Sequence, residues 1–320
     1  LSMSKQGKLQ QEVSMINIQR ILCPVDLSPV SVTAVDYATS LAKSYGAAVY
    51  LLHVVSPIVP GFEYAVDIRE VAQSLKERST EEMGKLVAKL EDTSVIAGVE
   101  VRVGNVYDEI KTAIETVGPD IVLMGTHRRG GVERLFRGST VEKLLRHSPA
   151  PIVTVPPEVR RHSPTSSFRR ILVATDFSEG TDEAMAYGLS LAQENQSRVT
   201  LLHVINDPAV DLSAAYRVQV IGTIQKQLED MVPAETRNWC EVVTRIETGT
   251  PYRNILRMLE TDEVDLVVMN IHSKGLFARA LIGSTAERVV RAATCPVMLI
   301  PPMKGQAKKT TPRIEERVAA

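Results

Sequence analysis

Short, almost wholly apolar runs alternate along the chain with longer stretches in which apolar residues recur at helical spacing. In the first half the runs fall at 21–25, 48–55, 99–103, 120–125 and 151–155. Runs of this length that are rich in Val, Ile and Leu are typical of strands buried on both faces. The intervening stretches predict helices near 29–45, 68–92, 108–116 and 141–147. This alternation predicts a parallel sheet with helices on both faces and right-handed crossovers.

The predicted first helix has clear boundary residues. Ser28 precedes Pro29, which is the order expected of an N-cap followed by a proline at the first helical position. Gly46 follows the last apolar position and predicts the end of the helix. Ser178 stands at the matching place in the second half and is predicted to be a cap as well.

The pattern occurs twice. Residues 21–55 align without gaps on 171–205, and 14 of the 35 positions are identical. A later match, which pairs Gly104 with Gly249, runs at a shorter offset, so the second copy has lost five residues. A repeat of this length is a whole domain rather than a solenoid unit. The expected domains are 18–157 and 168–302, joined by a linker rich in Pro, Ser and Arg and followed by a polar tail at 303–320.

Ligands of open parallel sheets bind beyond the carboxyl ends of the strands, where the winding direction reverses. The repeated motifs fall at these ends, at Asp26, at His53-Val54 and at Met124-Gly125. The sequence therefore predicts an α/β protein with two open-twisted, Rossmann-like sheets and a ligand site at their carboxyl edges.

Composition and charge narrow the function classes. The chain has 37 basic and 38 acidic residues, a net charge of −1, which argues against a dedicated nucleic-acid binder. Its three cysteines include no CxxC pair, so a disulfide framework or a cysteine-rich zinc site is not expected. No apolar run is long enough to span a bilayer. We expect a cytoplasmic protein that binds neither nucleic acid nor membrane.

The segment 124–146 has the highest concentration of glycine, hydroxyl and basic residues that could bind a ligand. Gly138-Ser139-Thr140 opens a predicted helix, where free N–H groups, hydroxyls and the helix dipole favour a phosphate. The preceding loop adds positive charge through His127, Arg128, Arg129, Arg134 and Arg137. The alternative is a capped helix that follows a solvated basic loop.

Asp26 and Asp176 each follow the first strand of their copy. Either carboxylate could contact a ribose, an adenine amine or a bound Mg²⁺, or it could accept backbone N–H groups at the start of the helix. His53 and His203 end apolar strands, and a lone histidine there is usually hydrogen-bonded rather than catalytic.

Several common enzyme signatures are missing. The sequence contains no G-x4-G-K-[ST] P-loop, no G-x-G-x-x-G after a strand, no G-x-S-x-G elbow and no H-E-x-x-H zinc motif. A conventional hydrolase or dehydrogenase is therefore disfavoured.

The strand-Asp-x-Ser motif, LLHVV, VGNVYDEI, MGTHRRGGVERLFRGST and PAPIVTV together resemble the universal stress protein domain. The resemblance covers both copies, from about 18 to 302. It implies five-stranded sheets of order 3-2-1-4-5 and an ATP motif, G-x2-G-x9-G-[ST]. It also implies antiparallel pairing of the last strand with its counterpart, here within one chain as a pseudo-dimer. Two such chains could associate further as a homodimer.

Carried over residue by residue, the resemblance assigns the nucleotide site of the first copy to Pro24, Val25, Asp26, Val54, Met124, Gly125, Arg128, Gly138, Ser139 and Thr140. The weaker site of the second copy consists of Ala174, Thr175, Asp176, Val204, Met269, Asn270, Ser273, Gly283, Ser284 and Thr285. Arg128 replaces the second motif glycine of the first copy, and both early glycines are lost from the second. Glycine lets the backbone approach phosphates and adopt φ > 0, so these replacements weaken the motif.

The function expected from the resemblance is a stress-response module that binds ATP or AMP, with or without Mg²⁺, and acts through its binding state. No metal site made by protein residues alone is expected, although Asp26 could help to hold nucleotide-bound Mg²⁺. The alternatives are an interaction scaffold without nucleotide and a slow ATPase. The sequence identifies no protein partner.

Overall fold

The computed structural model describes residues 16–56, 68–126, 140–157, 159, 168–178, 180–206, 214–271 and 283–301. Within these ranges the chain forms strands and helices in strict alternation, twice over, as the apolar pattern predicts.

The first half contains five strands and four helices in its described part. In chain order they are β1 (Arg20–Val25), α1 (Pro29–Tyr45), β2 (Ala48–Val55), α2 (Ile68–Val87), β3 (Ile96–Val103), α3 (Val106–Val117), β4 (Ile121–Gly125), α4 (Thr140–His147) and β5 (Ile152–Val155). The helix expected at 68–92 ends earlier, at Val87, and the other elements lie within a few residues of their predicted bounds.

The second half repeats this order with one additional short 3₁₀ helix. Its elements are β6 (Arg170–Thr175), α5 (Thr181–Asn195), β7 (Arg198–Ile205), α6 (Ala214–Asp230), η2 (Ala234–Asn238), β8 (Glu241–Thr248), α7 (Pro251–Thr261), β9 (Leu266–Asn270), α8 (Ser284–Ala292) and β10 (Val297–Ile300).

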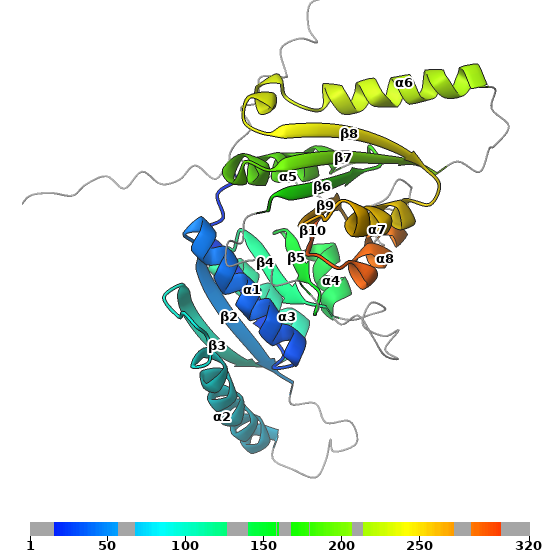
Figure 1. Cartoon of the computed structure of the whole chain (residues 1–320). Helices are drawn as coiled ribbons and strands as arrows, with labels where there is room; N and C mark the ends of the chain where they lie inside the picture. Colours follow the sequence, from blue (N-terminus) through cyan, green and yellow to red (C-terminus); the bar gives the residue numbers. More distant parts are fainter. Residues whose placement is uncertain are drawn as a thin grey trace, which may run out of the picture.

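All the described strands join one ten-stranded sheet of order β3-β2-β1-β4-β5-β10-β9-β6-β7-β8. Each half has the predicted order 3-2-1-4-5, and its internal pairs are parallel. The two predicted sheets are continuous because β5 and β10 pair antiparallel, with Val153 opposite Met298. These two residues occupy the same position in the two repeats, so a pseudo-two-fold axis passes between them. Figure 1 shows the two halves meeting at these strands.

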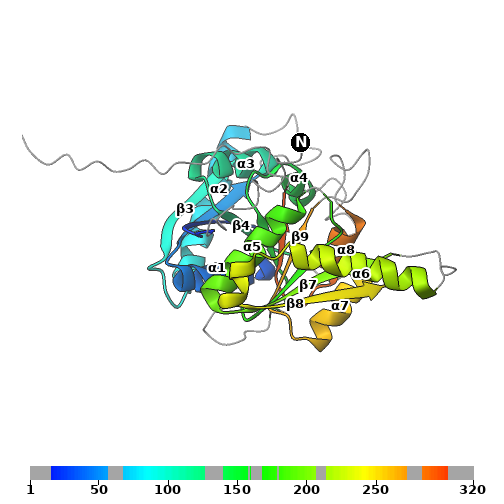
Figure 2. The same cartoon turned by 90° about the horizontal axis from the view of Figure 1, so that it is seen from above.

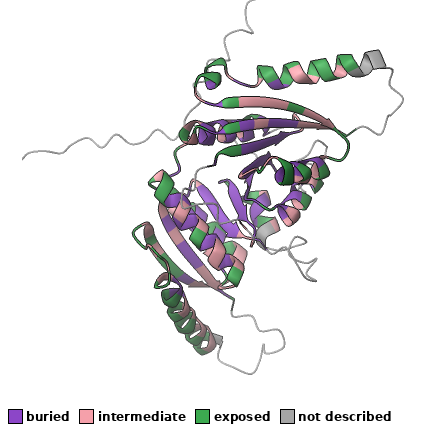
Figure 3. Cartoon of the chain, viewed as in Figure 1, coloured by how far each residue is buried: buried purple, intermediate pink, exposed green. Residues whose placement is uncertain are grey.

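Helices cover both faces of the sheet (Figure 2). The strand side chains that point to one face pack against α1, α2, α5 and α6. Those that point to the other face pack against α3, α4, α7 and α8. Figure 3 shows that burial is concentrated in the strands near the middle of the sheet and on the inner sides of the helices. Among the described helices, none combines the length and apolar character that a membrane crossing requires.

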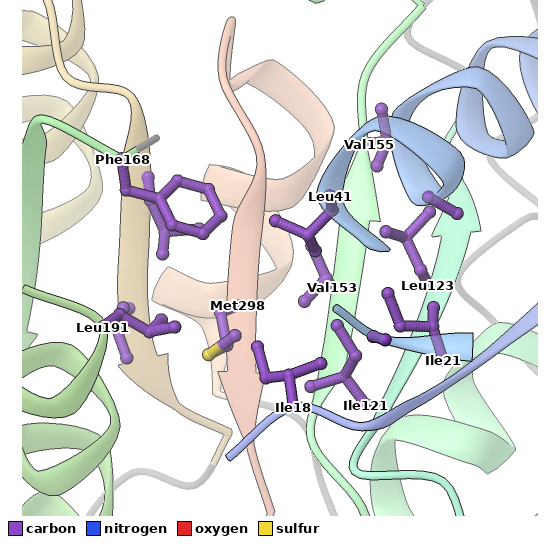
Figure 4. Close-up of a cluster of buried hydrophobic side chains, with 14 of the residues drawn as sticks. Ile18, Ile21, Leu41, Ile121, Leu123, Val153, Val155, Phe168, Leu191 and Met298 are labelled. Carbon is purple, nitrogen blue, oxygen red and sulfur yellow. The ribbon is translucent and has the colours of Figure 1, made fainter. Parts of the chain in front are cut away.

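The core runs without a break from one half to the other. Ile18 and Phe168, which precede the first strand of each repeat, are 1% and 3% exposed. Figure 4 places them on either side of Met298 of the central β10 strand, with Leu41 of α1 and Leu191 of α5 nearby. A shared apolar cluster of this kind favours two halves that associate stably.

The start of the first helix differs between the halves. The Ser28 side chain accepts a hydrogen bond from Ser31 N, which confirms the predicted cap of α1. The prediction for Ser178 is wrong. Helix α5 begins later, at Thr181, and its N-cap is Gly180, which makes no side-chain cap bond. Gly180 has a φ of 94°, a conformation that favours glycine.

Candidate functional site

The winding of each half reverses at its first strand, since β1 lies between β2 and β4 and β6 lies between β7 and β9. The carboxyl ends of these strands meet at one edge, where ligands of such sheets bind. The structure brings the following predicted residues to this edge in the first half: Pro24, Val25, Asp26, Val54, Met124 and Gly125. Their counterparts in the second half are Ala174, Thr175, Asp176, Val204, Met269 and Asn270.

The predicted phosphate segment is described only in part. Arg128, Gly138, Ser139 and Ser273 lie outside the described residues, as do the basic residues between 127 and 137. Thr140 begins α4, and Gly283 precedes Ser284 and Thr285 at the start of α8. Both helices therefore begin where the sequence places the phosphate-binding turn. Neither the side chain of Ser284 nor another side chain caps α8.

Pro24 determines where the β1–β4 ladder ends. The carbonyl of Arg20 accepts a hydrogen bond from Asp120 N, so the backbone groups of Arg20, Leu22 and Pro24 face β4. Proline has no N–H and cannot extend the ladder. The registered pairs accordingly stop at Leu22–Val122, two residues before Pro24.

The second half lacks this interruption because Ala174 stands in place of Pro24. The registered pairs between β6 and β9 continue to Ala174–Met269. Where the winding reverses, the pairing of β6 with β9 therefore extends further toward the carboxyl edge than the pairing of β1 with β4.

Gly125, at the end of β4, lies against the first turn of α1. A Cβ at this position would come within 2.8 Å of both Val30 Cγ1 and the Val30 carbonyl oxygen. Gly125 is not among the glycines with positive φ in the described chain. Of the two properties that glycine offers, Gly125 therefore uses the close approach of backbone to backbone and not a positive φ.

In the second half, the larger and the smaller of these two contacting residues have exchanged places. Asn270 replaces Gly125, and Gly180 replaces Val30. A Cβ on Gly180 would lie 3.5 Å from the Asn270 Cβ. The Asn270 amide donates a 2.7 Å hydrogen bond to Ser178 Oγ, and Asn270 is 8% exposed. Ser178 is thus bound across the strand ends instead of capping a helix, and a side chain fills space that is left to Gly125 in the first half.

Further hydrogen bonds tie the second-half edge together. The Thr175 hydroxyl accepts from Phe177 N at 3.0 Å and lies 3.1 Å from the Thr181 hydroxyl. Thr175 and Thr181 are both buried. The first half has Val25 at the position of Thr175, so it lacks this polar network.

The two aspartates occupy similar turns but differ in exposure. Asp26 is exposed and accepts a 3.0 Å hydrogen bond from Ser28 N through Oδ1. Asp176 is partly buried and accepts from Ser178 N at 2.9 Å. The following residues, Leu27 and Phe177, have φ values of 62° and 57°. Such left-handed backbone costs roughly 1–2 kcal/mol in a residue other than glycine. The backbone-accepting role considered for both carboxylates is therefore present, and Asp26 also remains accessible to a ligand.

The strand-end histidines are hydrogen-bonded, as expected. His53 Nδ1 donates to the Val25 carbonyl oxygen at 2.7 Å, and His203 Nδ1 donates to that of Thr175 at 2.9 Å. Each bond clamps the ends of two adjacent strands. Among the residues that the structure describes, no group of His, Cys, Asp and Glu side chains could hold a metal ion.

Two surface hollows formed by described residues lie at the opposite, amino edge of the sheet. One, of about 860 Å³, is lined by residues that include Gln193 and Trp239, and the other, of about 510 Å³, by residues that include Lys43 and Val95. Both are shallow and contain none of the predicted site residues. The candidate site is defined by the strand topology, since residues 127–139 and 272–282 lie outside the described residues.

Sequence reasoning missed Val30 and Gly180. Their importance comes from contacts with Gly125 and Asn270, which are about ninety positions away in the chain. Comparison of the two repeats carried a signal. Of the two contacting positions, the glycine is the one at the end of β4 in the first copy and the one before α5 in the second. A joint exchange of a small and a large residue is typical of two positions in contact.

Comparison with known proteins agrees with the fold and the repeat. The model of the universal stress protein family matches residues 17–156 and 167–301. A universal stress protein of Mycolicibacterium smegmatis is 26% identical over 88% of this chain and 97% of its own length. One from Methanocaldococcus jannaschii is 31% identical over 42% of this chain and 82% of its own.

Solved structures show the same fold. The crystal structure of a universal stress protein from Archaeoglobus fulgidus aligns with a TM-score of 0.65 at 23% identity, covering 90% of this chain and 98% of that one. Because the family model matches both halves and a relative matches almost the whole length, the chain belongs to the universal stress protein family and contains two of its domains in tandem.

Proposed function

We propose that this protein binds one adenine nucleotide, ATP or AMP, at the carboxyl edge of its first half and acts as a regulatory module through its bound and free states. The observation that carries the proposal is the early end of the β1–β4 ladder at Leu22–Val122, which leaves the ends of β1 and β4 unpaired with each other beyond this point. Dinucleotide and mononucleotide sites of open α/β sheets lie at such a reversal point.

The proposed adenosine position is at the ends of β1 and β2. Half-buried Val54 supplies apolar surface beside the buried Val25, and the exposed carboxylate of Asp26 can accept hydrogen bonds from ribose hydroxyls. The left-handed Leu27 turns the chain directly after Asp26, so the carboxylate stays at the edge of the sheet. Gly125 keeps the end of β4 free of a side chain beside this position.

The proposed phosphate position is the start of α4. The free N–H groups of a helix N-terminus and its dipole favour negative charge. Gly138, Ser139 and Thr140 stand at this start in the sequence, in agreement with the ATP motif that the family resemblance implies. Arg128 would add a positive charge in place of the motif's second glycine. A Mg²⁺ ion, if carried by the nucleotide, would lie within reach of Asp26.

We propose that the second half serves as a structural partner and binds nucleotide weakly or not at all. Its strand ends stay paired as far as Ala174–Met269. The Asn270 side chain occupies the place of the glycine and donates to Ser178. The edge residues of this half therefore satisfy one another, and a ligand would have to compete with these internal hydrogen bonds.

The first test is to identify what the purified full-length chain carries. Mass spectrometry of small molecules released on denaturation should detect ATP or AMP, whereas a scaffold without nucleotide would release neither. Calorimetric titration with ATP and AMP, with and without Mg²⁺, would then measure affinity. Ser139→Ala should weaken ATP binding, and unchanged affinity would refute the phosphate assignment. A turnover assay at stoichiometric protein separates a binding module from a slow ATPase.

A further inference from the structure

A cationic cluster lies on helices α7 and α8 of the second half. Tyr252, at the start of α7, accepts a 3.1 Å hydrogen bond from Arg253 Nε through its hydroxyl. Arg288 of α8 lies over the same ring, with its Cζ 4.7 Å from the ring centroid. Figure 1 shows α7 and α8 side by side. Two guanidinium groups from two helices therefore converge on one phenol ring.

Neither guanidinium has an acidic partner. Within the described part of the chain, no ion pair joins Arg253 or Arg288 to a carboxylate. Their neighbours differ, because Arg257 pairs with Glu247 at 2.9 Å and Arg291 pairs with Glu287 at 2.7 Å. Two exposed cations held at one ring without a counter-charge repel each other, and a bound anion would relieve that repulsion.

The first half has no such excess of charge at the matching place. Tyr107 occupies the position of Tyr252. Lys143, at the position of Arg288, has its Nζ 5.7 Å from the Tyr107 ring centroid. The residue that matches Arg253 is Asp108. The first half thus has one acid and one base at the two matching sequence positions, whereas the second half has two arginines. The cluster is a property of the second half and not of the repeated fold.

The aromatic ring of the cluster is anchored. The Tyr252 ring packs against the buried core beneath α7 and α8, so packing sets the position of the ring that both arginines approach. The hydrogen bond from Arg253, with the positive charges of Arg253 and Arg288, lowers the pKa of Tyr252. The surroundings of the hydroxyl thus stabilise negative charge, as a binding site for an anion must.

We propose that Tyr252, Arg253 and Arg288 form an anion site for a phosphoryl group, either free phosphate or the end of a polyphosphate chain. The guanidinium forks match the geometry of phosphate oxygens, and the tyrosine O–H supplies a third donor. None of these three residues belongs to the set proposed for the first-half nucleotide site.

The test uses the full chain and calorimetric titration with inorganic phosphate and, separately, with tripolyphosphate, at an ionic strength held constant with chloride. The Arg253→Gln/Arg288→Gln double variant should bind at least roughly tenfold more weakly, since two charge-assisted contacts are lost. The matched control is Arg245→Gln/Arg257→Gln, which removes the same charge from the same half. Both of its arginines are already paired, with Asp262 and Glu247, so its affinity should stay unchanged.

Tyrosine-labelled NMR spectra locate the site independently of affinity. The Tyr252 ring signals, assigned by Tyr252→Phe, should shift on addition of the anion and the Tyr107 signals should not. Binding of phosphate alone identifies a free-anion site, and binding of tripolyphosphate alone identifies a chain end. Ser139→Ala should leave this binding intact and so separates it from the phosphate position proposed at the start of α4. The proposal is overturned if neither anion binds, if both double variants lose affinity equally, or if neither variant changes it.

Discussion

The Asn195 side-chain amide donates a 2.6 Å hydrogen bond to the hydroxyl of Tyr45, and the two residues occupy the same position in the two repeats. A contact between equivalent positions marks the pseudo-two-fold axis, as the Val153–Met298 pair does in the sheet. Both contacts join the halves, one between the C-terminal ends of α1 and α5 and one between β5 and β10. The asymmetry of this pair, tyrosine against asparagine, allows a hydrogen bond that two tyrosines would not form in the same way.

The first prediction concerns the coupling of these two residues. A double-mutant cycle with Tyr45→Phe and Asn195→Ala, measured by urea unfolding, should give a coupling energy of about 0.5–1.5 kcal/mol. Tyr45→Phe alone should lower the free energy of unfolding by an amount in the lower part of this range. Asn195 keeps its second hydrogen bond, to the Leu191 carbonyl oxygen, in this variant. A coupling energy of zero would mean that the contact does not link the halves.

The second prediction exchanges the size pattern at the strand end. Gly125→Asn should destabilise the protein by roughly 1–3 kcal/mol, because the new Cβ meets Val30 at 2.8 Å, including its backbone oxygen. Val30→Gly added to Gly125→Asn should recover part of the loss, because glycine lets the chain adopt the φ of 94° found at Gly180.

Two controls sharpen this prediction. Val30→Ala/Gly125→Asn should not recover stability to the same extent, since alanine disfavours that φ. Gly84→Ala, in α2, meets no atom within 4 Å and should be neutral or stabilising by about 0.5–1 kcal/mol. The measurement is the urea midpoint of unfolding, compared between the unmodified chain and these four variants. Equal recovery by alanine and glycine would contradict the backbone explanation.

The third prediction concerns Pro24. Pro24→Ala restores an N–H that faces β4, so the amide of residue 24 should exchange slowly with solvent. Nucleotide affinity should fall, because the added pairing of β1 with β4 closes the edge proposed for the ligand. The converse change, Ala174→Pro, removes a ladder hydrogen bond from β6 and should destabilise the second half by roughly 1–3 kcal/mol, because a buried carbonyl of β9 loses its donor. Hydrogen exchange measured by mass spectrometry reports both effects. Rapid exchange at residue 24 of the first variant would show that the proline does not set the end of the ladder.

The fourth prediction is a loss of stability at alkaline pH. Burial raises the pKa of Tyr187 from 10.0 to about 12. A raised folded-state pKa stabilises the fold below the unfolded value, and this stabilisation is lost as the pH rises through 10 toward 12. The free energy of unfolding should therefore decline over that range, and in Tyr187→Phe the decline should be smaller by on the order of 2 kcal/mol.

The buried thiols of Cys23 and Cys295 contribute to this decline in all variants, since desolvation raises both of their pKa values from 9.0 to about 12. Tyr252→Phe is the matched control. The pKa of Tyr252 is lowered, chiefly by its hydrogen bond from Arg253, so removing this tyrosine should not flatten the alkaline decline. A pH profile for Tyr187→Phe that matches the unmodified chain would refute the prediction.

The sequence alone was sufficient for most of the fold because its evidence is local. The apolar run at 48–55 has the same bounds as β2, and Ser28-Pro29 predicted the start of α1 correctly. Ser178 was mispredicted since the same Ser-first pattern is followed there by Gly180, which delays the helix. A positional match between repeats does not carry over a role when a neighbouring backbone conformation changes.

The candidate site could be predicted in outline and not in detail. The carboxyl edge follows from strand order, so Asp26 and Gly125 were placed correctly at that edge. The reason for Gly125 was not visible, because it depends on the approach of β4 to α1 in space. The same holds for Asn270, whose hydrogen bond to Ser178 joins residues far apart in the chain. Their assignment to a nucleotide site remains a prediction.

The most direct test of the functional account is the number of nucleotides bound per chain and the aspartate on which binding depends. Native mass spectrometry with calorimetry should give one ATP or AMP per chain. Asp26→Asn should abolish or strongly weaken this binding, and the matched variant Asp176→Asn should leave it intact. Two nucleotides per chain, or binding that survives Asp26→Asn and fails with Asp176→Asn, would contradict the account.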